Sequence, residues 1–163
     1  MSFDPLVNYG VLDFSNEENL VYWNFSELIK TLITLSKNAG DQLEIMGTNA
    51  AATEMALDFD SFYTLSAAKY AKYKLLDGDQ MEELAALGIF MENKNIDEEF
   101  WSAEALYSSN EWKMIRNKAT RLLAMMEMDY LDIHLEKENK NVETVGGKKE
   151  SATVSQRLLK NRL

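Results

Sequence analysis

The side chains of this chain that could take part in chemistry are nearly all carboxylates. The 163 residues include 27 Asp and Glu, a single histidine and no cysteine. A hydrolytic nucleophile needs a base beside it, and His134, between Ile133 and Leu135, is the only imidazole available. A lone histidine at such a position is more often a surface or packing residue than a catalyst. We therefore expect no catalytic residues and no enzymatic activity.

The sequence also lacks the spacing of common metal and nucleotide sites. The Asp77-Gly78-Asp79 stretch begins like a calcium loop, but Glu82 stands at the sixth position, which that loop reserves for glycine. A di-iron bundle needs Glu-x-x-His, whereas Leu131 lies three residues before His134. The Gly146-Gly147 pair follows no expected strand. We expect neither a metal ion nor a cofactor.

The carboxylates gather in clusters along the chain. Three clusters lie at expected turns, and a fourth is a row spaced three and four residues apart on one helix face. Each cluster alone fits a helix cap or a solvated surface. Like charges on one face cost stability, however, so together they predict a surface that attracts a positively charged partner. The candidate partner-binding residues are Asp58, Asp60, Asp77, Glu83, Asp97, Glu98, Glu99, Asp129, Asp132 and Glu136.

The charge of the chain is divided unevenly. Residues 1–136 carry 24 acidic and 10 basic side chains, a formal charge of −14, whereas residues 137–163 carry 3 and 7, a charge of +4. A negative body repels phosphate backbones and anionic lipid. We therefore expect the body to bind a basic protein, and to bind neither nucleic acid nor membranes directly.

The composition predicts one folded domain in a reducing compartment. Apolar residues make up 46 % and aromatic residues 10 % of the chain, enough for a core at this length. The absence of cysteine fits the cytoplasm. Neither a signal peptide nor an apolar stretch of about 18 residues is present, so a soluble cytoplasmic protein is expected.

The elements that must position these side chains are helices. One proline and seven glycines leave few breaks, and the apolar periodicity predicts an all-α, single-domain bundle of about five helices with a basic C-terminal tail. The expected N-caps are Ser15, Asp41, Asp79, Asp97 and Ser108. The expected helices cover 16–37, 41–76 as one bent or two shorter helices, 80–92, a short helix after Asp97, and a helix of about 25 residues reaching Ile133, which we expect to be the central packing element.

The composition changes at Lys137. Residues 1–136 are expected to form the acidic helical domain. Residues 137–163 are expected to form a basic polar linker followed by a short amphipathic helix from Ser151, which carries Val154, Leu158 and Leu159.

One short stretch combines aromatic and basic residues. Tyr70 and Tyr73 stand among Lys69, Lys72 and Lys74, a combination that can stack and neutralise a single-stranded nucleic acid. Lysines beside an amphipathic helix are much commoner than such a site. We therefore interpret this stretch as a helix surface.

Four stretches between Met55 and Met128 carry a resemblance to a known group of proteins. They are Leu57-Asp58-Phe59-Asp60-Ser61-Phe62-Tyr63, Asp79-Gln80-Met81-Glu82-Glu83-Leu84, Glu99-Phe100-Trp101 and Glu111-Trp112-Lys113-Met114-Ile115-Arg116. Their order resembles one group of small acidic bacterial immunity proteins, the antidotes to polymorphic or contact-dependent toxins. The resemblance implies a helical, non-enzymatic protein that binds one toxin, commonly a nuclease or tRNase, over its active site or beside it. It transfers no binding residues.

Two functions from different classes follow. The first is an immunity or inhibitor protein whose acidic helical surface binds and neutralises a basic toxin, a nuclease above all. The second is an oligomeric scaffold or adaptor that binds a partner through its basic tail. A carboxylate-based metal enzyme is a third and lower alternative.

Overall fold

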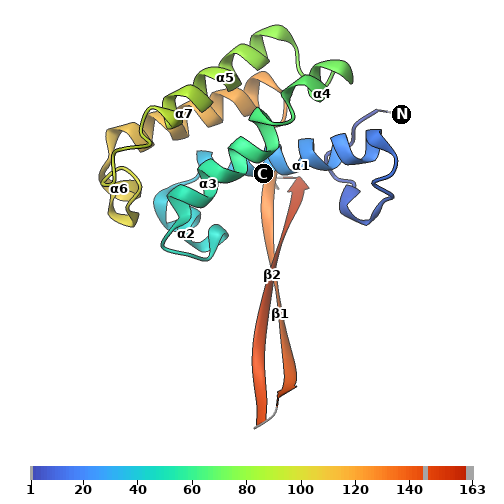
Figure 1. Cartoon of the computed structure of the whole chain (residues 1–163), viewed down its shortest axis with the longest axis vertical. Coiled ribbons are helices and arrows are strands. Elements are labelled where there is room, and N and C mark those ends of the chain that lie inside the picture. The colour runs from blue at the N-terminus through green and yellow to red at the C-terminus, as the bar shows by residue number, and fades with distance from the viewer. Residues whose placement is uncertain (1, 145–146, 161–163) are drawn as a thin grey trace.

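The computed structural model describes residues 2–144 and 147–160 of the chain. Most of them lie in helices, which confirms the mainly helical part of the predicted fold, and two strands follow at the C-terminal end (Figure 1). The elements are a 3-10 turn η1 (Tyr9–Val11), α1 (Glu17–Ser36), α2 (Ala39–Met46), α3 (Ala51–Phe59), a π-helical turn η2 (Asp60–Thr64), α4 (Ala67–Lys72), α5 (Gly78–Glu92), α6 (Ala103–Ser108), α7 (Asn110–Met125), β1 (Leu131–Thr144) and β2 (Gly147–Lys160).

Helix α1 is the central packing element. It contacts α7, α3, α2, α4 and the base of β1, and its side chains from Val21 to Leu35 are buried in several directions. The expectation that the helix after Ser108 would take this place is wrong. Helix α7 buries one face, which includes Trp112, Ile115 and Leu122, and leaves the other face in solvent.

Helices α5 and α7 lie side by side on one side of the body, and α1 lies between α7 and the strands (Figure 1). The ring of Trp112 is fully buried at the end of this layer and stacks on Phe100, with ring centroids 4.8 Å apart. Its Nε1 donates to the carbonyl oxygen of Phe100 at 2.8 Å. The indole thus fixes the turn before α6 against α7.

Helix α7 ends earlier than the apolar pattern predicted. Glu127 adopts a left-handed conformation with φ of 57°. The amide of Met128 then donates to the carbonyl of Leu123 at 2.8 Å, and the amide of Glu127 donates to the carbonyl of Ala124 at 3.1 Å. These are the two hydrogen bonds of a Schellman motif. The chain leaves the helix there, although Tyr130 and Ile133 continue the spacing of the stripe.

Strands β1 and β2 form an antiparallel hairpin that extends away from the helices (Figure 1). Pairing runs from Leu131 opposite Lys160 to Thr144 opposite Gly147. Among the hairpin side chains that the structure describes, Leu131 and Leu158 at its base are buried in the core. The expected helix therefore does not reach Ile133, because β1 begins at Leu131. Residues 137–144 and 147–160 lie in β1 and β2, in the segment 137–163 where a linker and a short amphipathic helix were expected, and residues 145–146 and 161–163 lie outside the described part.

Most of the expected N-caps are displaced by one to three residues. Asn16, Asn38, Asp77 and Ser109 cap α1, α2, α5 and α7, in place of Ser15, Asp41, Asp79 and Ser108. Asp97 accepts from the amide of Phe100 at 3.3 Å in a turn, and Ser102 caps the short helix α6 that follows. None of the helices within residues 2–144 and 147–160 has both the length and the apolar character needed to cross a bilayer.

Candidate partner-binding groove

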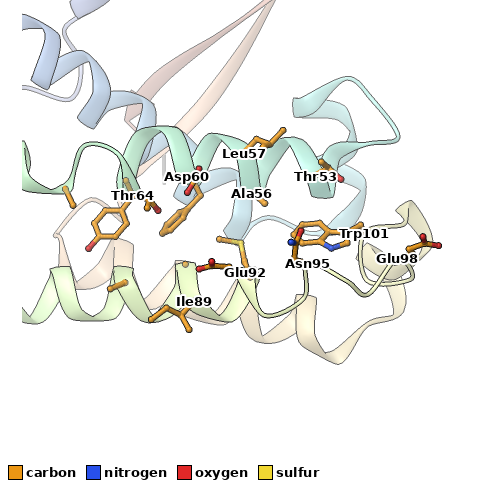
Figure 2. Close-up of a pocket in the computed structure, with 16 residues that line it drawn as sticks. Thr53, Ala56, Leu57, Asp60, Thr64, Ile89, Glu92, Asn95, Glu98 and Trp101 are labelled. Carbon is orange, nitrogen blue, oxygen red and sulfur yellow. The ribbon is translucent and has the colours of Figure 1, made fainter.

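A groove of about 850 Å³ lies between α3 with η2 on one side and α5 on the other (Figure 2). The loop after α5, which carries Asn95, Glu98 and Trp101, forms one end. We call this cavity the α3–α5 groove. Its size is typical of sites that bind a ligand or a few side chains of a partner.

The lining of the groove is largely apolar. Phe59, Tyr63 and Met91 belong to the buried core and also line the cavity. Leu57 on α3 and Ile89 on α5 line it as well, yet they are 55 % and 58 % exposed. Large apolar side chains that are half exposed on both walls of one cavity are typical of a surface that a partner covers.

Gly88 allows the two walls to approach each other. A Cβ atom at this position would lie 3.1 Å from Cε1 of Phe59, closer than ordinary van der Waals contact. A side chain at position 88 would therefore require the ring of Phe59 to shift by a few tenths of an ångström. The glycine sets the width of the groove at Phe59.

The wall formed by η2 contains a widened helical turn. The amide of Leu65 donates to the carbonyl of Asp60 at 3.1 Å, an i to i+5 bond. The hydroxyl of Tyr63 donates to the carbonyl of Met81 at 2.8 Å and ties this turn to α5. Single π-helical turns are rare and are found frequently at functional sites.

Trp101 is held at the end of the groove by its polar edge. Its Nε1 donates to the carbonyl of Lys94 at 2.8 Å, and its ring lies edge-on to Trp112 with centroids 6.3 Å apart. Only part of the side chain is buried, so the indole has one fixed edge and one face accessible from the cavity. Aromatic side chains fixed in this way are common at binding interfaces.

All charged side chains that line the groove are acidic. They are Asp60, Glu92 and Glu98, each of them exposed (Figure 2). The cation that neighbours this lining in sequence, Lys94, is paired with Glu111 of α7 at 2.9 Å. The groove therefore combines an apolar surface with uncompensated negative charge, and it suits a partner that is both apolar and basic.

The structure brings together only part of the predicted acidic surface. Asp60 and Glu98 both line the groove, although they are far apart in sequence, and they lie at separate places along it (Figure 2). Glu83 is partly buried on α5, and Glu99 and Asp129 are exposed outside the groove lining. The predicted residues therefore do not form one continuous site.

Other predicted carboxylates have partners within the chain. Asp77 accepts from the amide of Gln80 at 2.8 Å as the cap of α5, Asp97 stabilises its turn, and Asp132 pairs with Lys37 at 2.8 Å. Glu136 lies in β1, and its side chain is outside the described part of the structure.

Asp58 faces other carboxylates rather than the groove. Burial, followed by the charges of Glu54 and Glu27, raises its pKa to about 6. Glu27 is itself paired with Lys30 at 2.6 Å. This carboxyl therefore keeps its proton to a higher pH than an ordinary aspartate, although it is mostly ionised at pH 7.

The basic and aromatic stretch of α4 binds within the chain. Glu17 at the start of α1 accepts from Nζ of Lys69, from Nζ of Lys72 at 2.8 Å and from the hydroxyl of Tyr73 at 2.8 Å. These hydrogen bonds lower the pKa of Glu17 to about 2. Tyr70 is fully buried, so this stretch forms the contact between α4 and α1 and offers no stacking surface.

The sequence analysis missed Leu57, Ile89, Glu92 and Trp101 as site residues. A signal for two of them was present, because Leu57 and Ile89 lie off the core stripes formed by Met55 and Phe59 and by Leu84, Leu87 and Met91. An apolar residue outside the core stripe of its helix is a candidate contact residue. Glu92 and Trp101 gave no such signal, because their role depends on the pairing of α3 with α5.

Within the described part of the chain, no group of three or more His, Asp or Glu side chains is placed to hold a metal ion. Comparisons with protein-family models, curated proteins and solved structures found no significant match. The function is therefore inferred from the residues of the groove.

Proposed function

We propose that this protein is a non-enzymatic immunity or inhibitor protein that binds and neutralises a basic toxin, with a nuclease as the first candidate. The observation that carries this proposal is the α3–α5 groove, whose lining is apolar and whose charged members Asp60, Glu92 and Glu98 are all acidic. The formal charge of −14 over residues 1–136 and the resemblance of about residues 55–128 to small immunity proteins support the same function.

The mechanism requires binding alone. A nuclease holds the phosphates of its substrate with Lys and Arg, and carboxylates at the groove would form charge-assisted hydrogen bonds with the same groups. Apolar contacts at Leu57, Ile89 and Trp101 would slow dissociation, while the acidic body would speed association. The toxin is then occupied before it reaches nucleic acid.

The test uses the product of the reading frame next to the gene for this protein. That product is expressed alone and together with this chain, and growth and complex formation are measured. Growth arrest that is relieved by co-expression, with a complex on size-exclusion chromatography, is the expected result. A product that is harmless alone, or whose toxicity co-expression does not change, would contradict the proposal.

The hairpin supports a second candidate, a scaffold or adaptor that binds through the C-terminal segment. A two-stranded hairpin is marginally stable in water on its own, and the buried side chains described for this one, Leu131 and Leu158, lie at its base. Its outer part would gain stability from a second chain. This function differs from the first in where the partner binds.

A further inference from the structure

We infer that the occupant of the α3–α5 groove is an amphipathic helix of the partner, with one apolar row and flanking Lys or Arg residues. The inference rests on the proposed function, in that the partner is a basic protein. It adds the form in which that partner binds and the residues that receive it.

The walls of the groove favour a helix over an extended peptide. Both walls are helical, and their backbone N–H and C=O groups are bonded within α3, η2 and α5. No strand edge borders the lining, so an extended peptide would find no ladder of backbone partners there. A helix satisfies its own backbone and can present only side chains to the cavity.

The dimensions and the chemistry of the groove agree with this occupant. The wall formed by α3 and η2 runs from Ala51 to Thr64, roughly 20 Å at about 1.5 Å per residue. A partner helix of about four turns spans that length and presents apolar residues at i, i+4, i+7 and i+11. These would contact Leu57, Ile89 and Trp101, while its cations meet Asp60, Glu92 and Glu98.

Charge argues against a second copy of the helical body as the occupant. The described lining holds three carboxylates and no cation, and residues 1–136 carry 24 acidic against 10 basic side chains. Two such bodies would place like charges against each other in a partly apolar contact, which costs binding energy. A basic helix from another protein avoids that cost.

The test is a titration of the full-length protein with synthetic peptides. The first peptide has 14 residues, with leucine at positions 1, 5, 8 and 12 and lysine and alanine elsewhere. The second is a scramble of the same composition, and the third has glutamate in place of lysine. We expect the first peptide to bind at least about tenfold more tightly than either control, with an affinity that falls as salt rises.

Two matched variants test whether the peptide occupies the groove. Ala85 is exposed and lines the cavity, whereas Ala86 is exposed on the same helix and is not part of the lining. Ala85→Phe should weaken peptide binding by about tenfold or more, and Ala86→Phe should leave it unchanged. Leu57→Ser, at a side chain 55 % exposed, weakens binding without disturbing the core and serves as a second variant if Ala85→Phe does not fold.

Two triple variants separate local charge from net charge. Asp60→Asn with Glu92→Gln and Glu98→Gln removes the carboxylates of the groove. Asp79→Asn with Glu82→Gln and Glu99→Gln removes the same charge at exposed positions outside the lining. The first set should weaken binding by about tenfold and the second by about twofold or less.

Four outcomes would overturn the inference: equal binding of the scrambled peptide, full binding to Ala85→Phe, equal effects of the two triple variants, or a self-association that Ala85→Phe abolishes. The last would identify a second copy as the occupant. If Ala85→Phe no longer binds the peptide but still relieves growth arrest, the toxin does not bind in the groove. The proposed function would then stand without the groove as its site. Failure of the proposed function would instead show as growth arrest that the unmodified protein does not relieve.

Discussion

The partly buried Arg116 of α7 donates from Nη2 to Oε1 of Gln42 of α2 at 3.1 Å. Gln42 is fully buried, and its Nε2 donates to the carbonyls of Thr34 and Leu35 at 3.2 Å each. Nε of Arg116 donates to the carbonyl of Lys37 at 2.9 Å. The pair thus supplies donors to the carbonyls of Leu35 and Lys37 at the end of α1, adds a second donor to that of Thr34, which also accepts from the amide of Lys37 at 3.1 Å, and fixes α2 and α7 to that end.

Arg116→Met is therefore expected to destabilise the protein strongly. It leaves Oε1 of the buried Gln42 and the partly buried carbonyl of Lys37 without these donors, at a cost of about 3 kcal/mol. Arg116→Lys should restore little of this, because an ammonium group cannot reach both acceptors as the planar guanidinium does. Urea unfolding of both variants measures the change.

A double-mutant cycle with Gln42→Leu isolates the contact. If the two side chains act as one unit, the double variant loses less stability than the sum of the single losses, with a coupling of about 1–3 kcal/mol. Additive losses would show that the bond between the two side chains contributes nothing of its own.

Asp58 should make the stability of the protein depend on pH. Its pKa of about 6 in the folded state lies above the ordinary value of 3.8 because of burial, Glu54 and Glu27. Between roughly pH 4 and 6 the folded state keeps a proton that the unfolded chain has released, so the free energy of unfolding falls as the pH rises through this window. The expected loss at pH 7 is about 1 kcal/mol, since solvent screens a partly exposed group.

Asp58→Asn should remove that loss. The variant is expected to exceed the unmodified protein in stability at pH 7 and to match it below about pH 4, where the carboxyl is protonated in both states. Asp60→Asn, at an exposed side chain two residues further along the chain, is the control and should change stability little. If the free energies of unfolding of Asp58→Asn and the unmodified protein differ by the same amount at every pH from 3 to 7, the pKa of Asp58 is not raised in the folded state.

The positions of the helices could be predicted from local residue types, whereas the ends of α4 and α7 could not. The core stripes of the helices were readable, and helix starts could be placed to within one to three residues, because side-chain spacing and capping act over a few residues. The end of α7 was not, because Glu127 takes the left-handed position that glycine usually occupies. Lys74, with φ of 56°, ends α4 in the same way.

The groove was hidden from sequence analysis for a related reason. Asp60 and Glu98 were both identified as acidic candidates, but only the packing of η2 and the loop after α5 shows that they share a cavity. Conversely, Asp77 and Asp132 were identified in the same way, but Asp77 accepts a hydrogen bond from the amide of Gln80 and Asp132 is paired with Lys37. A cluster of acidic residues in the sequence indicates that a cation could be bound there. The tertiary fold then decides which of these carboxylates are free to bind a partner.

Glu17→Gln should weaken the attachment of α4 to α1. The pKa of Glu17 is held near 2 by hydrogen bonds from Lys69, Lys72 and Tyr73, so its contribution to stability is present above about pH 4.5 and is lost as the pH falls toward 2. The variant should melt at a lower temperature than the unmodified protein at pH 7, and the difference should shrink on acidification. Glu82→Gln, an exposed control on α5, should show no such difference.

Salt provides an independent check on this ion cluster. All members are partly exposed, so about 1 M salt should reduce the effect of Glu17→Gln at pH 7. A difference in melting temperature that is insensitive to both salt and pH would assign the effect to packing of the side chain.

The hairpin can be shortened without touching the core, and this separates the two candidate functions. Replacing residues 137–154 with Asn-Gly joins Glu136 to Ser155, which are opposite each other in the native register, through a two-residue turn. Leu131 and Leu158 stay in place, so we expect stability to change by less than about 1 kcal/mol. Deletion of the whole segment after residue 130 is a poorer test, because it removes both buried leucines and should cost about 2 kcal/mol or more.

Peptide titration and sedimentation equilibrium on the shortened protein distinguish the two candidate functions. If the groove is the binding site, the peptide affinity and the growth-rescue activity remain, since no residue of the lining follows Trp101. If the protein is a scaffold that assembles through its hairpin, the shortened chain loses its assembly or its partner while the groove still binds peptide. The measurement therefore assigns the partner either to the acidic groove or to the outer half of the hairpin, and loss of rescue with retained groove binding would favour the hairpin.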